Sequence, residues 1–247
     1  MKKVARKRLD LLLLERGLAE SRQKAAAMIL AGEIFVDNKP ACKAGAAVAE
    51  DAHIEVNSRL QKYVSRGGLK LEGALSDFQI DPSGKICLDI GSSTGGFTDC
   101  LLQHGAASVF AVDVNVDQIA WKLQQNARVL RIQKNARNLR PSDLPAPADF
   151  VIADVSFISV TKVLAPAIAC ARPGAEFLIL VKPQFELRRE DVGLGGIVKD
   201  QALHIRAVES VRHAAESAGL QTLGMQASRL PGAEGNQEYF LHLRKKA

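Results

Sequence analysis

The middle of the chain contains the run Ile86-Cys87-Leu88-Asp89-Ile90-Gly91-Ser92-Ser93-Thr94-Gly95-Gly96-Phe97. Its first five residues are typical of a buried strand, and the glycine-rich turn after them predicts a helix around residues 98–103. Because glycine has no side chain, such a turn lets a ligand approach the backbone closely. The run lacks the GxGxxG spacing of dinucleotide-binding proteins, which argues against a nicotinamide or flavin cofactor.

Three further apolar stretches follow, and each is closed by a charged residue. They cover residues 108–112, 150–153 and 177–181, and the closing residues are Asp113, Asp154 and Lys182. Strands that alternate with helices predict a mostly parallel sheet covered by helices on both faces. We expect the last strand, which Glu238 opens, to run antiparallel to the others. The sequence therefore predicts an α/β, Rossmann-like domain with these four charged residues at the edge where ligands bind.

The position of Asp113 indicates the kind of ligand. It ends the strand after the glycine-rich turn, 17 residues past Gly96, where a carboxylate can accept hydrogen bonds from both hydroxyls of a ribose. A glycine-rich turn and a ribose-binding acid without a pyrophosphate fingerprint favour S-adenosylmethionine. The alternative is an ordinary strand-to-helix turn followed by a surface aspartate, because single glycine motifs are weak signals.

Two lysines and two carboxylates form a candidate catalytic group: Lys70 in the first helix of this domain, Asp154, Lys182 and Glu238. A ribose 2′-hydroxyl is a very weak acid, so its methylation at neutral pH needs a base. A lysine can act as that base if burial or a second cation lowers its pKa. We expect the other lysine to supply that cation and the carboxylates to orient the ammonium groups. Taken singly, each residue is more often a partner in a surface salt bridge.

Residues 1–64 predict a separate α+β module. Apolar residues at helical spacing indicate a helix that starts near Leu9, and Ser21 and Gly32 are typical of the start and the end of a second helix. β-like stretches at 34–36 and 53–56 follow, with a turn at 37–40 after the first. Residues 58–62 are typical of a linker, so we place the domain boundary between residues 64 and 65.

Positive charge is concentrated in this module. Residues 1–64 carry 12 Lys or Arg against 8 Asp or Glu, which accounts for +4 of the net charge of +6. Arg22 and Lys24 lie in the first turn of the second helix, where cations oppose the helix dipole but a phosphate would bind. We interpret the module as RNA-binding, with a solvated, solubilising face as the alternative. The residues expected to contact RNA are Arg6, Lys7, Arg8, Arg16, Arg22 and Lys24.

Composition excludes several classes of protein. An apolar content of 47% argues against a disordered chain, and no run approaches the roughly 18 apolar residues of a membrane-spanning helix. The basic start of the chain and residues 9–14 imitate a signal peptide, but Asp10 interrupts the apolar run. Cysteines 42, 87, 100 and 170 form no CxxC pair and predict neither a metal site nor disulfides. We expect a cytoplasmic protein without bound metal or membrane, and favour a monomer.

Residues 6–64 resemble an S4 RNA-binding domain. The resemblance is carried by Arg8-Leu9-Asp10, by Glu15-Arg16-Gly17-Leu18-Ala19-Glu20-Ser21-Arg22, by Ala25, and by Ile29-Leu30-Ala31-Gly32-Glu33-Ile34-Phe35-Val36-Asp37. It implies contact with structured RNA, usually ribosomal or transfer RNA. Few aromatic residues lie among the basic ones, so contact with phosphates and RNA shape is expected rather than base stacking.

The second domain, residues 65–247, resembles the FtsJ-like 2′-O-ribose methyltransferases. The catalytic signature of that family, Lys-Asp-Lys-Glu, matches Lys70, Asp154, Lys182 and Glu238. The resemblance implies a class I methyltransferase fold and an S-adenosylmethionine site formed by Gly91, Gly95, Gly96, Phe97, Asp113, Asn135 and Asp154. Asn135 stands where many members have an acid, and Phe97 where tryptophan is common.

Nearly the whole chain resembles the TlyA family of ribosomal RNA cytidine 2′-O-methyltransferases. The motifs that carry this resemblance are residues 63–68, 154–159, 181–186 and 235–238. It implies methylation of cytidine in 16S ribosomal RNA, 23S ribosomal RNA or both, with ribosomal subunits as partners. The alternatives are a non-catalytic ribosome-binding or assembly factor, and a haemolysin, a label that the family also carries.

The segment 184–200 follows Lys182 directly and contains three glycines and several basic residues. We expect it to be a mobile loop that becomes ordered on RNA and helps enclose the target nucleotide. The alternative is a solvated connection.

Overall fold

The computed structural model describes residues 5–37, 39–41, 43–56, 62–232 and 235–246. The chain forms two compact units, Met1–Arg66 and Gly67–Ala247, and each is described by itself. Asn38 of the predicted turn, Cys42 and residues 58–61 of the predicted linker lie outside the described residues.

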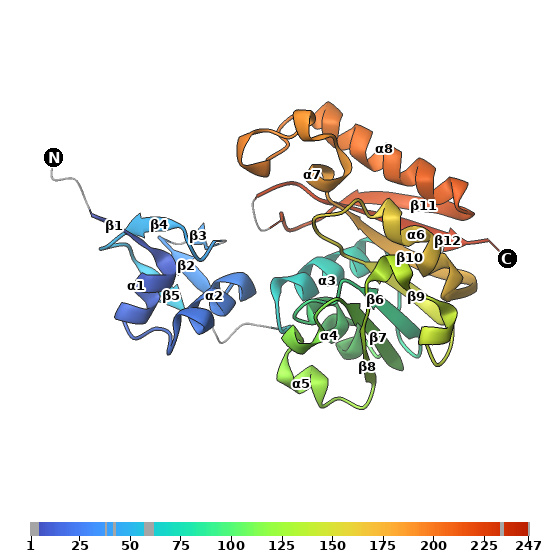
Figure 1. Cartoon of the computed structure of the whole chain (residues 1–247), viewed down its shortest axis with the longest axis horizontal. Helices are drawn as coiled ribbons and strands as arrows, with labels where there is room; N and C mark the ends of the chain where they lie inside the picture. The colour runs from blue at the N-terminus through green and yellow to red at the C-terminus, as the bar shows by residue number, and fades with distance from the viewer. Residues whose placement is uncertain (1–4, 38, 42, 57–61, 233–234, 247) are drawn as a thin grey trace. The chain divides into compact units, whose positions relative to one another are not determined.

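The N-terminal unit combines two helices with small antiparallel sheets (Figure 1). Strand β2 pairs with β3 and β5, and β1 pairs with β4. The core consists of apolar side chains from both helices and β2, including Leu9, Leu13, Ile29 and Ile34. The elements are β1 (Arg6–Arg8), α1 (Leu9–Glu15), α2 (Arg22–Ala31), β2 (Ile34–Val36), β3 (Lys39–Pro40), β4 (Ala47–Ala49) and β5 (Ile54–Val56).

Both predicted ends of the second helix are confirmed. The Ser21 hydroxyl accepts a hydrogen bond from the Lys24 backbone N–H at 3.1 Å, so it caps the start of α2. Gly32 ends the helix with φ of 79°, a left-handed conformation that glycine adopts without a steric penalty.

A seven-stranded sheet forms the centre of the second unit, in the order β11-β12-β10-β9-β6-β7-β8. Strand β12 runs antiparallel to both of its neighbours, while the pairs from β10 to β8 are parallel, as predicted. The strands are β6 (Ile86–Ile90), β7 (Ser108–Asp113), β8 (Val129–Gln133), β9 (Ala148–Ala153), β10 (Ala171–Val181), β11 (Leu220–Ala227) and β12 (Tyr239–Lys245).

Helices of different length cover this sheet. Helix α4 lies against β6 and β7, whereas α6 and α8 lie together against β10. The α-helices are α3 (Arg66–Phe78), α4 (Gly96–Gln103), α5 (Trp121–Gln124), α6 (Thr161–Ala169), α7 (Pro183–Glu186) and α8 (Gln201–Ser217). The single 3-10 turns are η2 (Val116–Gln118), η3 (Ala136–Asn138), η4 (Pro141–Asp143), η5 (Arg189–Asp191) and η6 (Leu194–Gly196).

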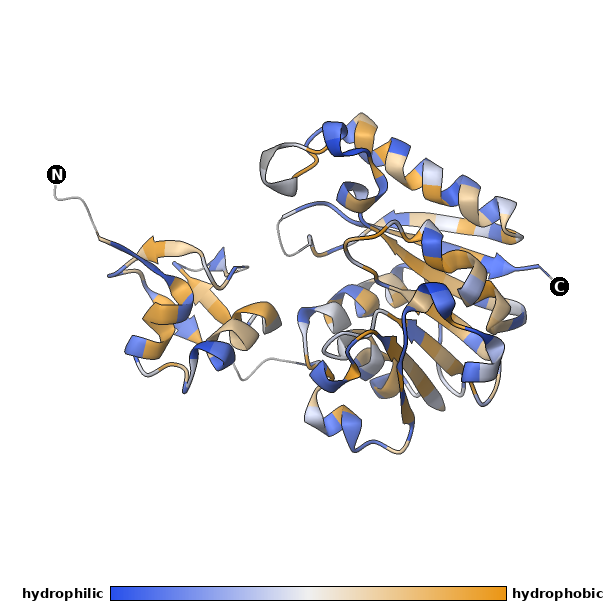
Figure 2. Ribbon diagram, viewed as in Figure 1, coloured by the Kyte–Doolittle hydropathy of each residue, from blue (hydrophilic) through white to orange (hydrophobic). Residues whose placement is uncertain are grey.

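Burial explains which strands the sequence revealed. Apolar residues line the central strands (Figure 2), and the predicted strands β6, β7, β9 and β10 are those whose residues are mostly buried. The sequence analysis missed β8 and β11, the two edge strands of the sheet. Each has one neighbour and mixes buried or half-buried residues with exposed ones, some polar and some apolar, so neither contains a continuous buried apolar run.

Candidate active site

A cavity of about 450 Å³ opens where the parallel strands end. Gly91 follows β6, Asp113 ends β7 and Asp154 follows β9, and all three line the cavity together with Asn135. Register brings them together, because Ile90 at the end of β6 pairs with Val112 on one side and Ala153 on the other. Four of the predicted cofactor residues therefore meet at the expected edge.

The glycine-rich turn has a steric reason for its composition. Gly91 has φ of 85°, and a Cβ atom there would lie 2.1 Å from the Asp154 carbonyl oxygen. Gly95 has φ of 92° and precedes α4, and a Cβ atom there would lie 2.4 Å from Leu123 Cδ1. A side chain at Gly91 would clash with the backbone of the neighbouring strand end, and one at Gly95 would need Leu123 to move.

Three other predicted cofactor residues, Gly95, Gly96 and Phe97, are not among the residues that line the cavity. Gly96 is the first residue of α4. Phe97 is buried, and its ring centroid lies 6.4 Å from that of Phe240, so its side chain is part of the interior. A direct role for Phe97 in cofactor binding stays a prediction.

Asp113 is held in place by the backbone around it. Its Oδ2 atom accepts a hydrogen bond from the Ser93 N–H at 2.9 Å, and its Oδ1 atom accepts one from the Asn115 N–H at 3.0 Å. The carboxylate thus ties the glycine-rich turn to the end of β7. Gln118, which also lines the cavity, donates to Asp113 Oδ1 at 3.3 Å.

The amide oxygen of Asn135 accepts hydrogen bonds from the backbone N–H and the Nε–H of Arg137, at 3.1 and 3.2 Å. It caps the turn η3. We therefore expect the side chain of Asn135 to contact a ligand in the cavity through its amide nitrogen, which can only donate a hydrogen bond.

Two buried polar atoms near this edge fit a polar, positively charged ligand. Asp89 Oδ1 and Ser92 Oγ find no hydrogen-bond partner within the described part of the chain. Burial is the main cause that raises the pKa of Asp89 to about 7. The hydrogen bonds with Thr98 lower this pKa, and the charges of Asp154 and Asp113 raise it by smaller amounts. A cation in the cavity would favour the ionised form of Asp89.

The four predicted catalytic residues form two ion pairs. Lys182 Nζ lies 2.5 Å from Asp154 Oδ1 and donates to Ser156 Oγ at 2.9 Å. Lys70 Nζ lies 2.6 Å from Glu238 Oε2. The negative charge of Glu238 also acts on Lys182, so the two pairs lie within electrostatic reach of each other.

The charge state of Lys182 differs from the expectation. Burial would lower the pKa of Lys182, but attraction to Asp154 and then to Glu238 outweighs burial, and the pKa is raised. The prediction that the other lysine lowers this pKa is therefore wrong for the protein without ligands. Lys70 instead pairs with Glu238 and offsets part of the negative charge that Lys182 experiences.

Several residues of the cavity wall were not predicted from the sequence. Ser156 and Phe157 line it, and Phe157 has φ of 66° and is 88% exposed. Its ring lies 5.4 Å from that of Phe185 in α7. An aromatic side chain so exposed in a left-handed conformation suggests a functional constraint. The motif 154–159 contains both residues, but only their position beside the cavity indicates a role.

Most of the predicted RNA-binding residues have partners within the N-terminal unit. Arg8 and Arg22 both pair with the buried Asp10, at 2.8 Å. Lys7 pairs with Glu15, while Arg6 and Arg16 donate to backbone carbonyl groups. Asp10 thus compensates the unfavourable position of the Arg22 cation at the start of α2, so this position does not by itself indicate a phosphate site.

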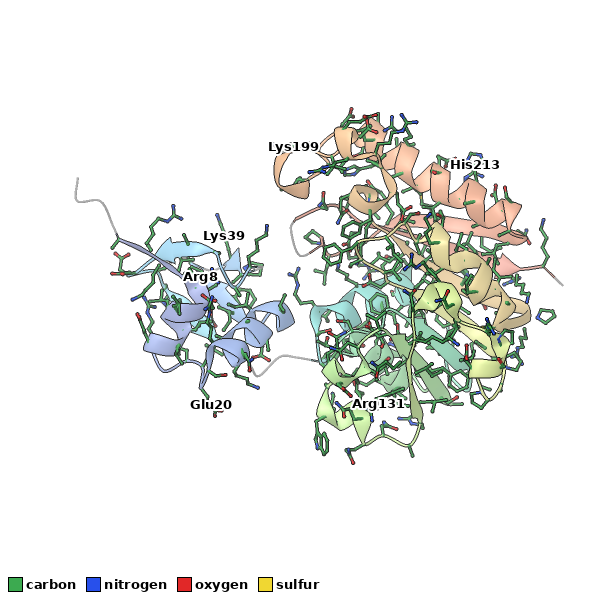
Figure 3. The ribbon with its side chains drawn as sticks, in the orientation of Figure 1. Arg8, Glu20, Lys39, Arg131, Lys199 and His213 are labelled. Atoms are coloured by element: carbon green, nitrogen blue, oxygen red, sulfur yellow. The ribbon has the colours of Figure 1, made fainter. Side chains whose placement is uncertain are left out.

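Lys24 and Lys39 are the better candidates for phosphate contact. Both side chains are exposed, and Figure 3 shows Lys39 extending from the N-terminal unit. Neither forms an ion pair with another residue in the described ranges of the chain.

Replacing Lys24 with alanine is expected to weaken RNA binding and to reduce the steepness of its salt dependence, because one phosphate contact and its released counterions are lost. Arg22→Ala is the contrasting variant, since it takes one partner from the buried Asp10 carboxylate and should lower the thermal stability of the unit. Filter binding across a salt series, with a melting curve for each variant, separates the two effects. An unchanged salt slope for Lys24→Ala would contradict the assignment.

Part of the segment 184–200 is fixed by its contacts. Asn236 donates to the Gly196 carbonyl at 2.8 Å and accepts from the Val198 N–H at 2.9 Å. His204 Nε2 lies 2.8 Å from the Val198 carbonyl oxygen. These contacts tie residues 196–198 to α8 and to the approach to β12, and the predicted ordering on RNA stays a prediction. Lys199, labelled in Figure 3, is exposed beside this anchor.

The sheet order with its antiparallel β12 and the cavity at the strand ends define a class I methyltransferase fold. Known proteins agree with this class. Residues 63–245 match the FtsJ-like methyltransferase family and residues 7–54 match the S4 domain. The chain therefore belongs to the FtsJ-like methyltransferase family, and an S4 domain precedes its methyltransferase domain.

Individual relatives are similar over nearly the whole chain. The 16S/23S rRNA (cytidine-2'-O)-methyltransferase TlyA of Mycobacterium tuberculosis is 46% identical over 97% of this chain and 90% of its own length. A solved structure from Streptococcus thermophilus that carries a hemolysin name is 38% identical, covers 99% of this chain and 90% of that chain, and has a TM-score of 0.77. The N-methyltransferase NodS of Bradyrhizobium japonicum, solved with S-adenosyl-L-homocysteine, shares the fold at 13% identity, with a TM-score of 0.52 over 74% of this chain and 86% of that chain.

Within the described residues there is no helix long and apolar enough to cross a membrane. The same part of the chain contains no cluster of three or more His, Cys, Asp or Glu residues that could hold a metal ion.

Proposed function

We propose that this protein transfers the methyl group of S-adenosylmethionine to the ribose 2′-hydroxyl of cytidine in ribosomal RNA. The observation that carries the proposal is the Lys182–Asp154 pair, which stands at the wall of the strand-end cavity with Ser156 as a third partner. The substrate follows from the similarity to TlyA and from the S4 domain.

The residues around the cavity account for cofactor binding. Asp113 would accept the ribose hydroxyls, and the backbone of the turn at Gly91 would lie against the ligand. Asp89 and Ser92 supply buried polar atoms that are free to bind a charged amino-acid group. When bound, S-adenosylmethionine supplies an electrophilic methyl group on a sulfonium cation.

Lys182 would act as the base of the reaction. The Lys182 ammonium group must first lose a proton to solvent. In the protein without ligands, attraction to Asp154 and Glu238 opposes that loss. Because Asp154 lines the cavity and also pairs with Lys182, it would share its charge between Lys182 and a cationic ligand. Its attraction for the Lys182 proton then weakens. The neutral amine of Lys182 would take the proton of the 2′-hydroxyl as that oxygen becomes methylated, and the methyl donor would leave as S-adenosyl-L-homocysteine.

Phe157 is the candidate for contact with the target base. Its exposed ring lies at the cavity wall and is supported by Phe185. Unstacked RNA bases commonly stack on such aromatic side chains, with a contribution of about 1–3 kcal/mol per base.

The kcat/KM for methylation should rise with pH, by about tenfold per unit at most, because the fraction of neutral Lys182 grows as the pH approaches its raised pKa. The sign follows from the role: the base must be unprotonated, and attraction to Asp154 keeps it protonated at neutral pH. Initial rates between about pH 6.5 and 9 measure the slope, with circular dichroism at each pH as a control for folding. A rate that is flat or falls over this range would argue against Lys182 as the base.

Asp113→Ala should weaken S-adenosylmethionine binding by about 10- to 150-fold, the equivalent of roughly 1.5–3 kcal/mol for hydrogen bonds to a charged acceptor. Asp117→Ala is the matched control, because that carboxylate is exposed and its ion pair with Arg131 is long, at 3.8 Å. Calorimetry gives both affinities, and equal affinities for the two variants would contradict the role of Asp113.

A transfer assay separates the proposed enzyme from a non-catalytic ribosome-binding factor. The protein is incubated with ribosomal subunits and S-adenosylmethionine that carries a labelled methyl group. The proposal predicts label in the RNA, whereas a binding factor would bind the subunits and leave the RNA unlabelled.

A further inference from the structure

Strands β9 and β10 are neighbours in the sheet, and each is followed by a segment of chain. These two segments contact each other. The first segment, residues 154–160, follows β9 and leads into α6. The second segment, residues 182–186, follows β10 and consists of Lys182 and helix α7. Lys182 contacts the start of the first segment through Asp154 and Ser156. At the other end of α7, Glu186 contacts Ser159 and Val160.

The contacts of Glu186 are those of a helix cap supplied from another element. Its Oε2 atom accepts from the Ser159 hydroxyl at 2.5 Å, and its Oε1 atom accepts from the Val160 N–H at 2.8 Å. Val160 is the N-cap residue of α6 and makes no side-chain cap of its own. The Ser159 hydroxyl also accepts from the Thr161 N–H at 3.2 Å, so the chain of contacts runs from Glu186 into the first turn of α6.

A carboxylate at this position is favourable for two reasons. Free N–H groups and the positive end of the helix dipole favour a negative charge at the start of a helix. Burial raises the pKa of Glu186, and the two hydrogen bonds offset only part of that rise. Hydrogen bonds to a charged acceptor of this kind are stronger than bonds between neutral groups.

The portion of chain between the two anchors forms part of the cavity wall. It contains Ser156, which accepts from Lys182, and Phe157, which stays in a left-handed conformation with φ of 66°. A non-glycine residue keeps such a conformation only when its surroundings hold it there. The ring of Phe185, the residue before Glu186, lies against Phe157 and adds to that support.

We propose that Glu186 is a positioning residue for the reaction: by capping α6 across the two strands, its carboxylate fixes residues 155–160 so that Ser156 and Phe157 stand correctly beside Lys182. This proposal rests on the proposed function for its kinetic part. Its structural part, the fixing of the segment, can be measured without any methyl transfer.

Glu186→Ala and Glu186→Gln are compared in the full-length protein. The alanine variant loses both hydrogen bonds, and we expect kcat to fall about 10- to 100-fold, the range that a misplacement of about 1 Å can produce. The glutamine variant keeps an oxygen for the Val160 N–H and an amide group that the Ser159 hydroxyl can meet by rotation. It should restore kcat to within about threefold of the original protein, because geometry rather than charge is what Glu186 provides. The alanine variant should also melt at a lower temperature, because the buried Val160 N–H loses its partner, and the glutamine variant should recover most of that loss.

Hydrogen exchange supplies the readout that does not depend on activity. In Glu186→Ala, peptides that cover residues 155–162 should exchange faster, and in Glu186→Gln their protection should return. Glu190→Ala is the matched control, because Glu190 lies in the same segment but is exposed and pairs only loosely with Arg188, at 3.5 Å. It should leave both exchange and kcat unchanged.

Each outcome bears on the proposal. Unchanged protection of residues 155–162 in Glu186→Ala would overturn it, whatever the activity. Lost protection with unchanged kcat would overturn the positioning role while leaving the cap. A glutamine variant as slow as the alanine variant, with protection restored, would show that the charge of Glu186 matters and not its geometry. Failure of the proposed function itself would appear differently, as absence of transfer by the unmodified protein.

Discussion

Replacing Lys182 with alanine is expected to lower the rate of methyl transfer about 10²- to 10⁴-fold, the usual contribution of a general base. Lys182 is the amine that contacts Asp154 and Ser156 beside the cavity, and its neutral form is a stronger base than the Asp154 carboxylate, so we expect it to take the proton of the 2′-hydroxyl. Single-turnover transfer to ribosomal subunits measures the chemical step directly.

Two further variants make the result specific. Lys182→Arg keeps a positive charge beside Asp154 but cannot supply a neutral amine, so it should be as inactive as the alanine variant. Lys162→Ala removes an exposed lysine of α6 and should have no effect. If Lys182→Ala transferred methyl groups at nearly the original rate, with the fold and RNA binding intact, the catalytic assignment would be wrong.

Deleting residues 1–57 is expected to leave S-adenosylmethionine binding intact and to abolish methylation of intact ribosomal subunits. The glycine-rich turn, Asp113 and both lysine–carboxylate pairs all belong to the compact unit Gly67–Ala247. The deleted part contains the S4 domain, with 10 Lys or Arg against 8 Asp or Glu. RNA affinity that rests on phosphate contacts should be lost with it.

Calorimetry with the truncated protein and a transfer assay on subunits measure the two halves of this prediction. A truncated protein that methylates subunits at the full-length rate would show that the N-terminal unit does not target the RNA. Loss of cofactor binding on truncation would contradict the proposed division of labour between the two units.

The sequence predicted the centre of the sheet because burial leaves a simple pattern there. Strands buried on both faces appear as continuous apolar runs, and the charged residue that ends each run is visible as a break. Asp113, Asp154 and Lys182 could therefore be placed at one edge before their distances were known. The edge strands β8 and β11 carry mixed residues, and each pairs with only one other strand, so no continuous apolar run marks them in the sequence.

The charge arrangements could not be predicted from the sequence in the same way. The pKa of Lys182 depends on which charges lie nearest in space, and the structure places Asp154 beside it and Lys70 beside Glu238. The role of Arg22 changed for a similar reason, since Asp10, twelve positions earlier, turned out to be its partner. Phe157 and Glu186 were present in quoted motifs, but only three-dimensional contacts distinguish them from the residues around them.

The central claim is that the 2′-hydroxyl of a cytidine in ribosomal RNA receives the methyl group. The most direct measurement is to treat separated small and large ribosomal subunits that lack this modification with the full-length protein and S-adenosylmethionine, and to digest the RNA to nucleosides for mass spectrometry. Our account predicts 2′-O-methylcytidine from at least one subunit, with the methyl group on the ribose fragment, and none with Lys182→Ala. Methylation on a base, 2′-O-methylation of another nucleoside alone, or no methylation of either subunit would contradict it.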